Sequence, residues 1–119
     1  MYFSSLEQLK MNSPYDNGRW EKDKLIEYLI QSNNKKFSEY INAFFCKHIN
    51  DSILADILFD IVLDDDYDGS DAKMGAAYFI SKLSENLLMT RRSRLLEAQN
   101  NEIYACRPLT YIDYVYEWL

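Results

Sequence analysis

Glycine and proline are scarce in this chain of 119 residues, which has three glycines and two prolines. Tight turns between β-strands depend on these two residue types, and long alternating runs of β-branched residues are also missing. A sheet of many short strands is therefore excluded, and apolar residues recur at helical spacing instead. The sequence predicts an all-α fold and, at this length, a single helical domain covering residues 1–119.

Histidine and cysteine are nearly absent: the chain contains one histidine, His48, and two cysteines, Cys46 and Cys106. Zinc needs three or four such ligands, and the two cysteines lack the close spacing of metal or redox pairs, so we expect free, mostly buried thiols. His48 falls on the apolar face of its predicted helix and is expected to be a core or boundary residue. Glycine-rich phosphate loops of the GxGxxG or GxxxxGK type are missing as well. The chain is predicted not to be an enzyme and to need no cofactor.

Long uncharged apolar runs are also missing. A membrane-spanning helix needs about 20 consecutive apolar residues, and the N-terminal "MYFSSLEQLK" lacks the basic start and apolar core of a signal peptide. We therefore expect a cytoplasmic protein without a membrane partner.

Basic residues are missing from one long stretch. Between Asp51 and Asp71 there are eight aspartates and no lysine or arginine, whereas "TRRSR" brings together Arg91, Arg92 and Arg94; the net charge of the chain is −6. Such an acidic field repels nucleic acid and membrane phosphates and attracts basic proteins. Direct nucleic-acid binding is therefore disfavoured, and the arginines are expected to pair with acids in the domain or on a partner.

Apolar periodicity and capping residues predict six to seven amphipathic helices in antiparallel pairs. We expect them at about 6–11, 20–31, 36–49, 51–63, 70–83 and 85–98, with an aromatic helix after Pro108, and a break at "NSPYDNGRW". Ser4 and Glu7 have the spacing of a capping box for the first helix, and Asp51 is expected to cap the fourth. In that fourth helix the residues expected to face inward are Ile53, Leu54, Ile57, Leu58, Ile61 and Val62.

Three aspartates of the fourth predicted helix, Asp56, Asp60 and Asp64, are four residues apart and share one face without a lysine partner. Like charges at this spacing destabilise a helix by about 0.2–0.5 kcal/mol per pair, and anions near a helix C-terminus also oppose its dipole. A solvated, inert face is one explanation. The unfavourable placement favours another, in which the carboxylates form a surface for a basic partner.

The aspartate-rich turn "DDDYDG" also has four residues at the first, third, fifth and sixth positions of an EF-hand calcium loop: Asp64, Asp66, Asp68 and Gly69. The twelfth position, which must supply a bidentate carboxylate, is Gly75, and the normally apolar eighth position is Asp71. The match fails at the twelfth position, whose bidentate carboxylate is needed for calcium affinity, so no metal site is predicted. Weak calcium binding stays open.

The segment from 51 to 83 resembles a HEAT repeat unit, in which a helix and an acidic turn precede a second helix, here "DAKMGAAYFISKL". The positions that carry the resemblance are the apolar and basic pair, the paired alanines and the spaced apolar residues: Ala72, Lys73, Ala76, Ala77, Ile80 and Leu83. Gly75 and Ala76 would let a paired helix approach closely. The resemblance implies a HEAT-like α–α layer whose flanking helix pairs act as caps.

A small, acidic, tyrosine-rich helical chain without catalytic residues resembles the bacterial immunity proteins that neutralise toxins of contact-dependent growth inhibition and related polymorphic systems, some of which have HEAT-like folds. The resemblance implies a cognate protein toxin as partner, expected to be a basic nuclease domain whose active site is covered by carboxylates in place of phosphates. The predicted partner-binding residues are Asp56, Asp60, Asp64, Asp65, Asp66, Tyr67, Asp68 and Asp71.

Two alternatives stay open. The same surface suits a non-immunity adaptor or a phage-type inhibitor that binds another basic protein, and the aspartate turn leaves room for an EF-hand-like calcium-binding protein. The sequence does not determine the oligomeric state.

Overall fold

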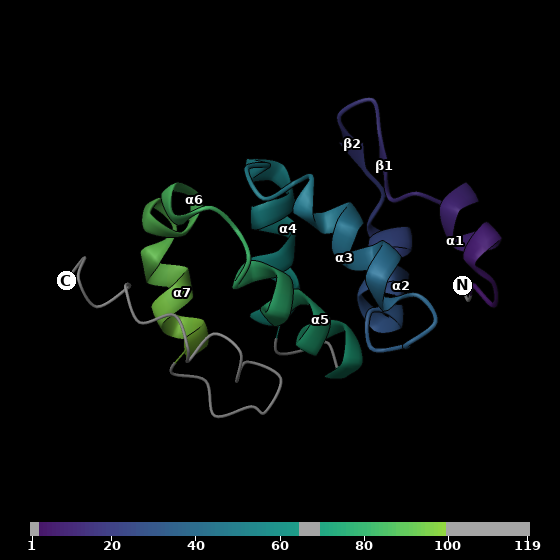
Figure 1. The fold of residues 1–119 in the computed structure, drawn as a ribbon. Coiled ribbons are helices and arrows are strands. Elements are labelled where there is room, and N and C mark those ends of the chain that lie inside the picture. Colours follow the sequence, from purple (N-terminus) through teal and green to yellow (C-terminus); the bar gives the residue numbers. More distant parts are fainter. Residues whose placement is uncertain (1–2, 65–69, 100–119) are drawn as a thin grey trace.

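A computed structural model describes residues 3–64 and 70–99 of the chain. This part folds into helices and one short hairpin, so the predicted all-α class is confirmed (Figure 1). The elements are α1 (Leu6–Met11), β1 (Tyr15–Asp16), β2 (Arg19–Trp20), α2 (Lys22–Gln31), α3 (Ser38–Cys46), α4 (Ser52–Val62), α5 (Ser70–Ile80), α6 (Glu85–Thr90) and α7 (Arg92–Gln99). The predicted aromatic helix after Pro108 and Cys106 lie outside the described residues.

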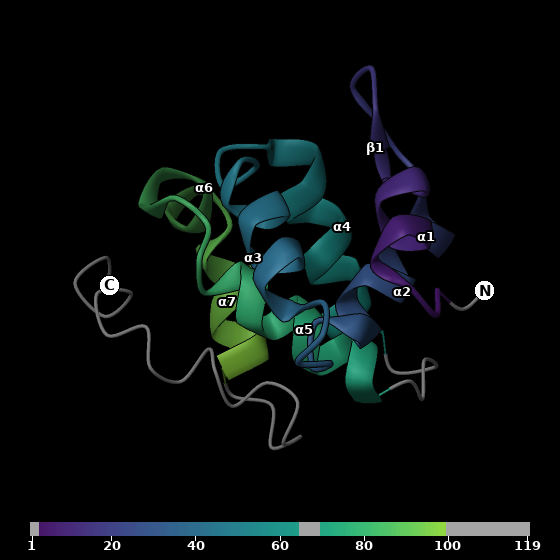
Figure 2. The same cartoon turned by 45° about the vertical axis from the view of Figure 1, so that its right-hand side comes forward.

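The molecule measures 44 × 28 × 24 Å. Figures 1 and 2 show α1 and the hairpin at one end, α6 and α7 at the other, and α2 to α5 between them. Over the residues that the structure describes, every helix is too short or too polar to cross a membrane.

The first helix has the predicted bounds, but its capping residue is Ser5 and not Ser4. The Ser5 hydroxyl accepts a hydrogen bond from the backbone N–H of Gln8 over 3.2 Å, and the backbone N–H of Ser4 donates to the Gln8 side-chain oxygen over 2.8 Å. The cap therefore lies one residue later than predicted, and the Gln8 side chain turns back to the N–H of Ser4, one residue before the capping residue of a capping box. Tyr28 of α2 then fixes α1 by donating to the carbonyl of Leu9.

The segment predicted as a simple break contains the hairpin. Asn17 and Gly18 both have positive φ, at 48° and 81°, and Tyr15 pairs with Trp20 across the strands. Two such residues form the two-residue turn that matches the natural twist of antiparallel strands. The chain therefore reverses direction here and brings two aromatic side chains together.

The core is built around α4 and α5 in the middle of the molecule. Leu54, Leu58 and Phe59 of α4 are buried, and α5 packs against both α4 and α2. The prediction was wrong for Ile53, whose side chain is 56% exposed. Ile53 precedes Asp56 and Asp60 by three and seven residues, so it shares the outer stripe of the helix with these carboxylates.

Gly75 brings α5 into close contact with α2. A Cβ atom at this position would lie 2.5 Å from the carbonyl oxygen of Leu29, which is closer than nonbonded atoms pack. The predicted close approach at Gly75 is confirmed, and the neighbouring helix is α2. Ala76 and Ala77, which follow it, are fully buried.

The sixth predicted helix is in fact two helices, α6 and α7, separated at Arg91. The backbone of Arg91 adopts φ −117° and ψ 26°, outside the helical region, and its N–H donates to the carbonyl of Leu88 three residues earlier. The two short helices pack against each other, and Leu88 and Leu95 bury their side chains in the core.

Cys46 is a free thiol, as predicted, but it is exposed and not buried. It is the last residue of α3 and follows the buried Phe45, so it lies about 100° further around the helix. The apolar stripe of α3 does not reach that far.

Candidate functional site

The carboxylates of Asp56 and Asp60 lie on the exposed face of α4, and each is paired with an arginine from the C-terminal helices. The Nε of Arg91 donates to Asp56 Oδ1 over 2.7 Å, and its Nη2 donates to Asp56 Oδ2 over 3.3 Å. The Nη2 of Arg94 donates to Asp60 Oδ1 over 2.5 Å. The helix itself supplies no basic partner, as the sequence indicated, but the fold brings two of them from more than thirty residues away.

Arg91 joins two helices that are far apart in sequence, α4 and α6. Its Nη1 donates to the carbonyl of Leu87 over 3.3 Å and to the hydroxyl of Thr90 over 3.0 Å, and its Nη2 donates to the carbonyl of Ser52 over 3.4 Å. The side chain is 16% exposed. With the bonds to Asp56, one guanidinium holds the end of α6 and the first turn of α4 together.

The hydrogen bond from Arg91 lowers the pKa of Asp56; burial opposes this shift, and the charges of Arg91 and Arg94 add smaller effects that also lower the pKa. The Arg94 guanidinium also lies 5.3 Å from the centre of the Phe59 ring and 3.8 Å from Asp56 Oδ1. Its side chain is 33% exposed, and that of Asp60 is 63% exposed. Exposed pairs of this kind contribute about 0–1 kcal/mol, so Asp60 can exchange its partner at little cost.

The aspartate run continues past the end of α4, where Asp64 is exposed. The carbonyl of Asp64 accepts a hydrogen bond from Lys73 Nζ over 2.6 Å, and Lys73 is buried with only 6% of its surface exposed. A cation is favourable at a helix C-terminus, so Lys73 compensates part of the charge that the sequence places there. Asp71, in the first turn of α5, is exposed at the favourable N-terminal end of its helix.

Half of the predicted partner-binding residues lie outside the described residues, namely Asp65, Asp66, Tyr67 and Asp68. Within residues 3–64 and 70–99, the structure contains no group of three or more histidine, cysteine, aspartate or glutamate residues that could hold a metal ion. The calcium loop predicted as an alternative includes Asp66 and Asp68, so calcium binding stays a prediction.

His48 packs among aromatic rings near the base of the hairpin. Its ring centre lies 4.7 Å from that of Tyr15, 5.0 Å from that of Trp20 and 5.0 Å from that of Phe44. Burial lowers its pKa, while Asp51 opposes and Lys47 reinforces that shift. The prediction of a boundary position is confirmed, because the residue is partly buried.

Asp51 connects this aromatic cluster to α4. Its Oδ1 accepts hydrogen bonds from the backbone N–H groups of Ile53 and Leu54 over 2.9 and 3.1 Å, which confirms the predicted cap. Its Oδ2 accepts one from the Trp20 indole N–H over 3.0 Å. One carboxylate therefore begins α4 and anchors the hairpin.

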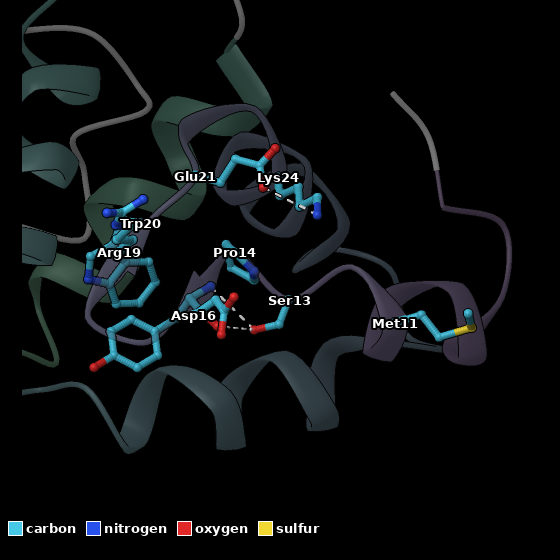
Figure 3. Close-up of a pocket in the computed structure, with 9 residues that line it drawn as sticks. Met11, Ser13, Pro14, Asp16, Arg19, Trp20, Glu21 and Lys24 are labelled. Atoms are coloured by element: carbon cyan, nitrogen blue, oxygen red, sulfur yellow. Dashed lines mark hydrogen bonds and ion pairs between the residues drawn. The ribbon is translucent and has the colours of Figure 1, made fainter.

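An open pocket of 510 Å³ lies between the hairpin and the helices beside it (Figure 3). Its lining contains Trp20, Tyr15 and the 83% exposed Met11. The pocket is lined by two acidic residues, Asp16 and Glu21, and by two basic residues, Arg19 and Lys24. No charge dominates this pocket, and its lining does not select a ligand. The Asn17-Gly18 turn was the sequence signal that could have located it.

Comparison of the chain with protein-family models, curated proteins and solved structures finds no match. The function must therefore be argued from the residues themselves.

Proposed function

We propose that this chain is an immunity protein that binds and neutralises a cognate toxin, a basic nuclease domain, through its acidic surface. The observation that carries the proposal is the run of eight aspartates without a lysine or arginine between residues 51 and 71. Carboxylates in such density imitate the phosphates that a nuclease cleft binds, and their field accelerates the encounter with a basic protein.

The exposure of the described aspartates supports the proposal. Asp56 and Asp60 have side chains that are 54% and 63% exposed, and Asp64 and Asp71 are exposed at the two ends of the α4–α5 connection. Asp56 and Asp60 belong to α4, Asp71 belongs to α5 and Asp64 follows the end of α4, and the two helices pack directly against each other. A partner can therefore meet several carboxylates at once, which is the condition for a specific rather than a diffuse electrostatic contact.

Arg91 and Arg94 reduce the negative charge of the surface at Asp56 and Asp60. Arg91, whose side chain is mostly buried, forms an ion pair with Asp56. Arg94 is more exposed and donates one short hydrogen bond to Asp60. We therefore expect Asp56 and Asp60 to attract a basic partner less than their exposure alone suggests. Asp60 would join the interface when a partner arginine replaces Arg94, and Asp56 would contribute least.

The proposal is tested by affinity capture from cells of the source organism at low and high salt. One variant changes Asp64, Asp66 and Asp68 to lysine, and a matched variant changes the exposed Glu7, Asp23 and Glu39 to lysine, so that both have the same net charge. We expect the wild type and the matched variant to retain one basic polypeptide at low salt and the first variant to lose it.

The retained polypeptide is then assayed for nuclease activity with and without the chain. Inhibition at a one-to-one ratio supports an immunity protein, and a retained protein without toxic activity supports the adaptor alternative. Equal capture by both lysine variants would remove the aspartate run from the interface and with it the basis of the proposal.

A further inference from the structure

An apolar groove lies between α3 and α5, on residues that have no part in the acidic surface. Its volume is 340 Å³. Leu54 and Leu58 of α4 line it and are almost fully buried. Phe45 and Phe79 also line it, with rings stacked at 4.0 Å between centres and 26° between planes. The groove is therefore bounded by rigid aromatic and branched aliphatic side chains.

A second hollow of 300 Å³ continues this groove toward the start of α5. The two share Asn42, Tyr78 and Phe79, and the second is also lined by Met74 and Gly75. Together they form an elongated channel along α5. Ligand sites are commonly apolar hollows of about 300–1,000 Å³ with a few placed polar groups.

Among the described residues that line the two hollows, Lys82 is the only charged one. Its Nζ lies 5.3 Å from the centre of the Tyr78 ring, and Tyr78 is 40% exposed. Across the portion of the chain that the structure covers, Lys82 forms no ion pair. An apolar channel thus has one unneutralised cation at its rim.

We propose that this channel binds a small amphiphile with an aliphatic or aromatic body and one carboxylate. The body would lie along the partly exposed side chains of Ile49 and Tyr78, and the carboxylate would accept hydrogen bonds from the Lys82 ammonium group, a charge-assisted contact stronger than a neutral one. An α-helix with its side chains is about 10 Å across and is too wide for hollows of 340 and 300 Å³, whereas an alkyl chain fits into them. This site goes beyond the proposed inhibition and does not depend on it.

The test is a titration of the full chain with decanoate, below its micelle concentration, followed by NMR of ¹³C-labelled isoleucine and leucine methyl groups. We expect saturable shifts at Ile49, Leu54, Leu58 and Leu83, which line the groove. Decyltrimethylammonium, with the same tail and the opposite charge, should bind at least about tenfold more weakly, which corresponds to about 1.4 kcal/mol. Lys82→Gln should weaken decanoate binding by a similar factor.

The matched control is Lys47→Gln, which removes the same charge from an exposed position outside the groove and should leave the affinity within about twofold. Equal decanoate affinity of Lys82→Gln and the wild type would overturn the proposal. Methyl shifts scattered over the surface, or no shifts, would do the same. Methyl signals that move on dilution of the ligand-free protein would assign the groove to a second copy of the chain and also overturn it.

Discussion

The guanidinium of Arg91 and the carboxylate of Asp56 form a two-point hydrogen-bonded pair across 35 positions of sequence. The pair stands where the helical path breaks between α6 and α7, so the residue that interrupts the helix is also the one that fastens it to α4. An acidic stripe that looks unbalanced in the sequence is thus partly balanced by the fold.

Replacing Arg91 should destabilise the protein more than replacing Arg94. Arg91→Gln removes bonds to Asp56, to the Ser52 and Leu87 carbonyls and to a hydroxyl from a side chain that is 16% exposed, so we expect a loss of about 1–2 kcal/mol. Arg94→Gln, which removes the same charge, should cost at most about 1 kcal/mol. Urea unfolding followed by circular dichroism measures both, and equal losses would contradict the structural role of Arg91.

Gly75→Ala should destabilise the protein although alanine favours a helix by about 1 kcal/mol over glycine. The added methyl group would lie 2.5 Å from the Leu29 carbonyl oxygen, and a backbone atom cannot move aside as a side chain can. Overpacking of this kind costs about 1–3 kcal/mol. Thermal unfolding provides the measurement, with Glu97→Ala on the exposed face of α7 as the control, expected within about 0.5 kcal/mol of wild type. A more stable Gly75→Ala variant would show that α2 and α5 are further apart.

Asp51→Asn should separate the two tasks of this carboxylate. Asparagine still caps α4 through its carbonyl oxygen, but its NH₂ group cannot accept the Trp20 indole hydrogen bond. We expect a loss of about 0.5–1 kcal/mol, against about 1–2 kcal/mol for Asp51→Ala, which removes the cap as well. The Trp20 indole N–H signal in a ¹⁵N spectrum should move upfield in both variants. An unmoved signal would mean that the indole has another acceptor.

The stability of the protein should fall as the pH is lowered from 7.5 to 5.5, in part because of His48. Burial lowers the pKa of His48 from 6.5, so in this range the unfolded chain takes up a proton before the folded one does. Stability rises with pH wherever the unfolded state binds more protons, and the contribution of His48 is therefore full above pH 6.5 and lost below it. Denaturant midpoints across this range should vary less in His48→Gln. An unchanged pH dependence would exclude His48 as its source.

Local features of this fold could be predicted from the sequence, and distant pairings could not. Asp51 caps α4 through N–H groups two and three residues away, so its role can be predicted from the local sequence. Arg91 and Arg94 meet Asp56 and Asp60 only because α7 folds back on α4. The spacings i, i+3 and i, i+4 within each pair place its members on one face, but they do not say which faces meet.

Ile53 shows a second limit. The first half of α4 contains Ile53, Leu54, Ile57 and Leu58, which is more apolar surface than one face can bury. Periodicity then fits more than one helix orientation, and tertiary packing decides which residue is left outside. In the candidate site, the sequence predicts the row of aspartates on one face of α4. Their pairing with Arg91 and Arg94 depends on the fold.

The close contact of Gly75 with Leu29 joins two helices that are far apart in sequence. α4 and α5 are neighbours in sequence and can pair through a short loop, whereas α2 meets α5 only after α3 and α4 have been synthesised. During translation, the apolar side of α2 therefore stays without its main partner until α5 has been synthesised. The α2–α5 contact encloses a longer stretch of chain than the α4–α5 contact does. A side chain at position 75 would obstruct this long-range contact, through which α2 joins the rest of the core.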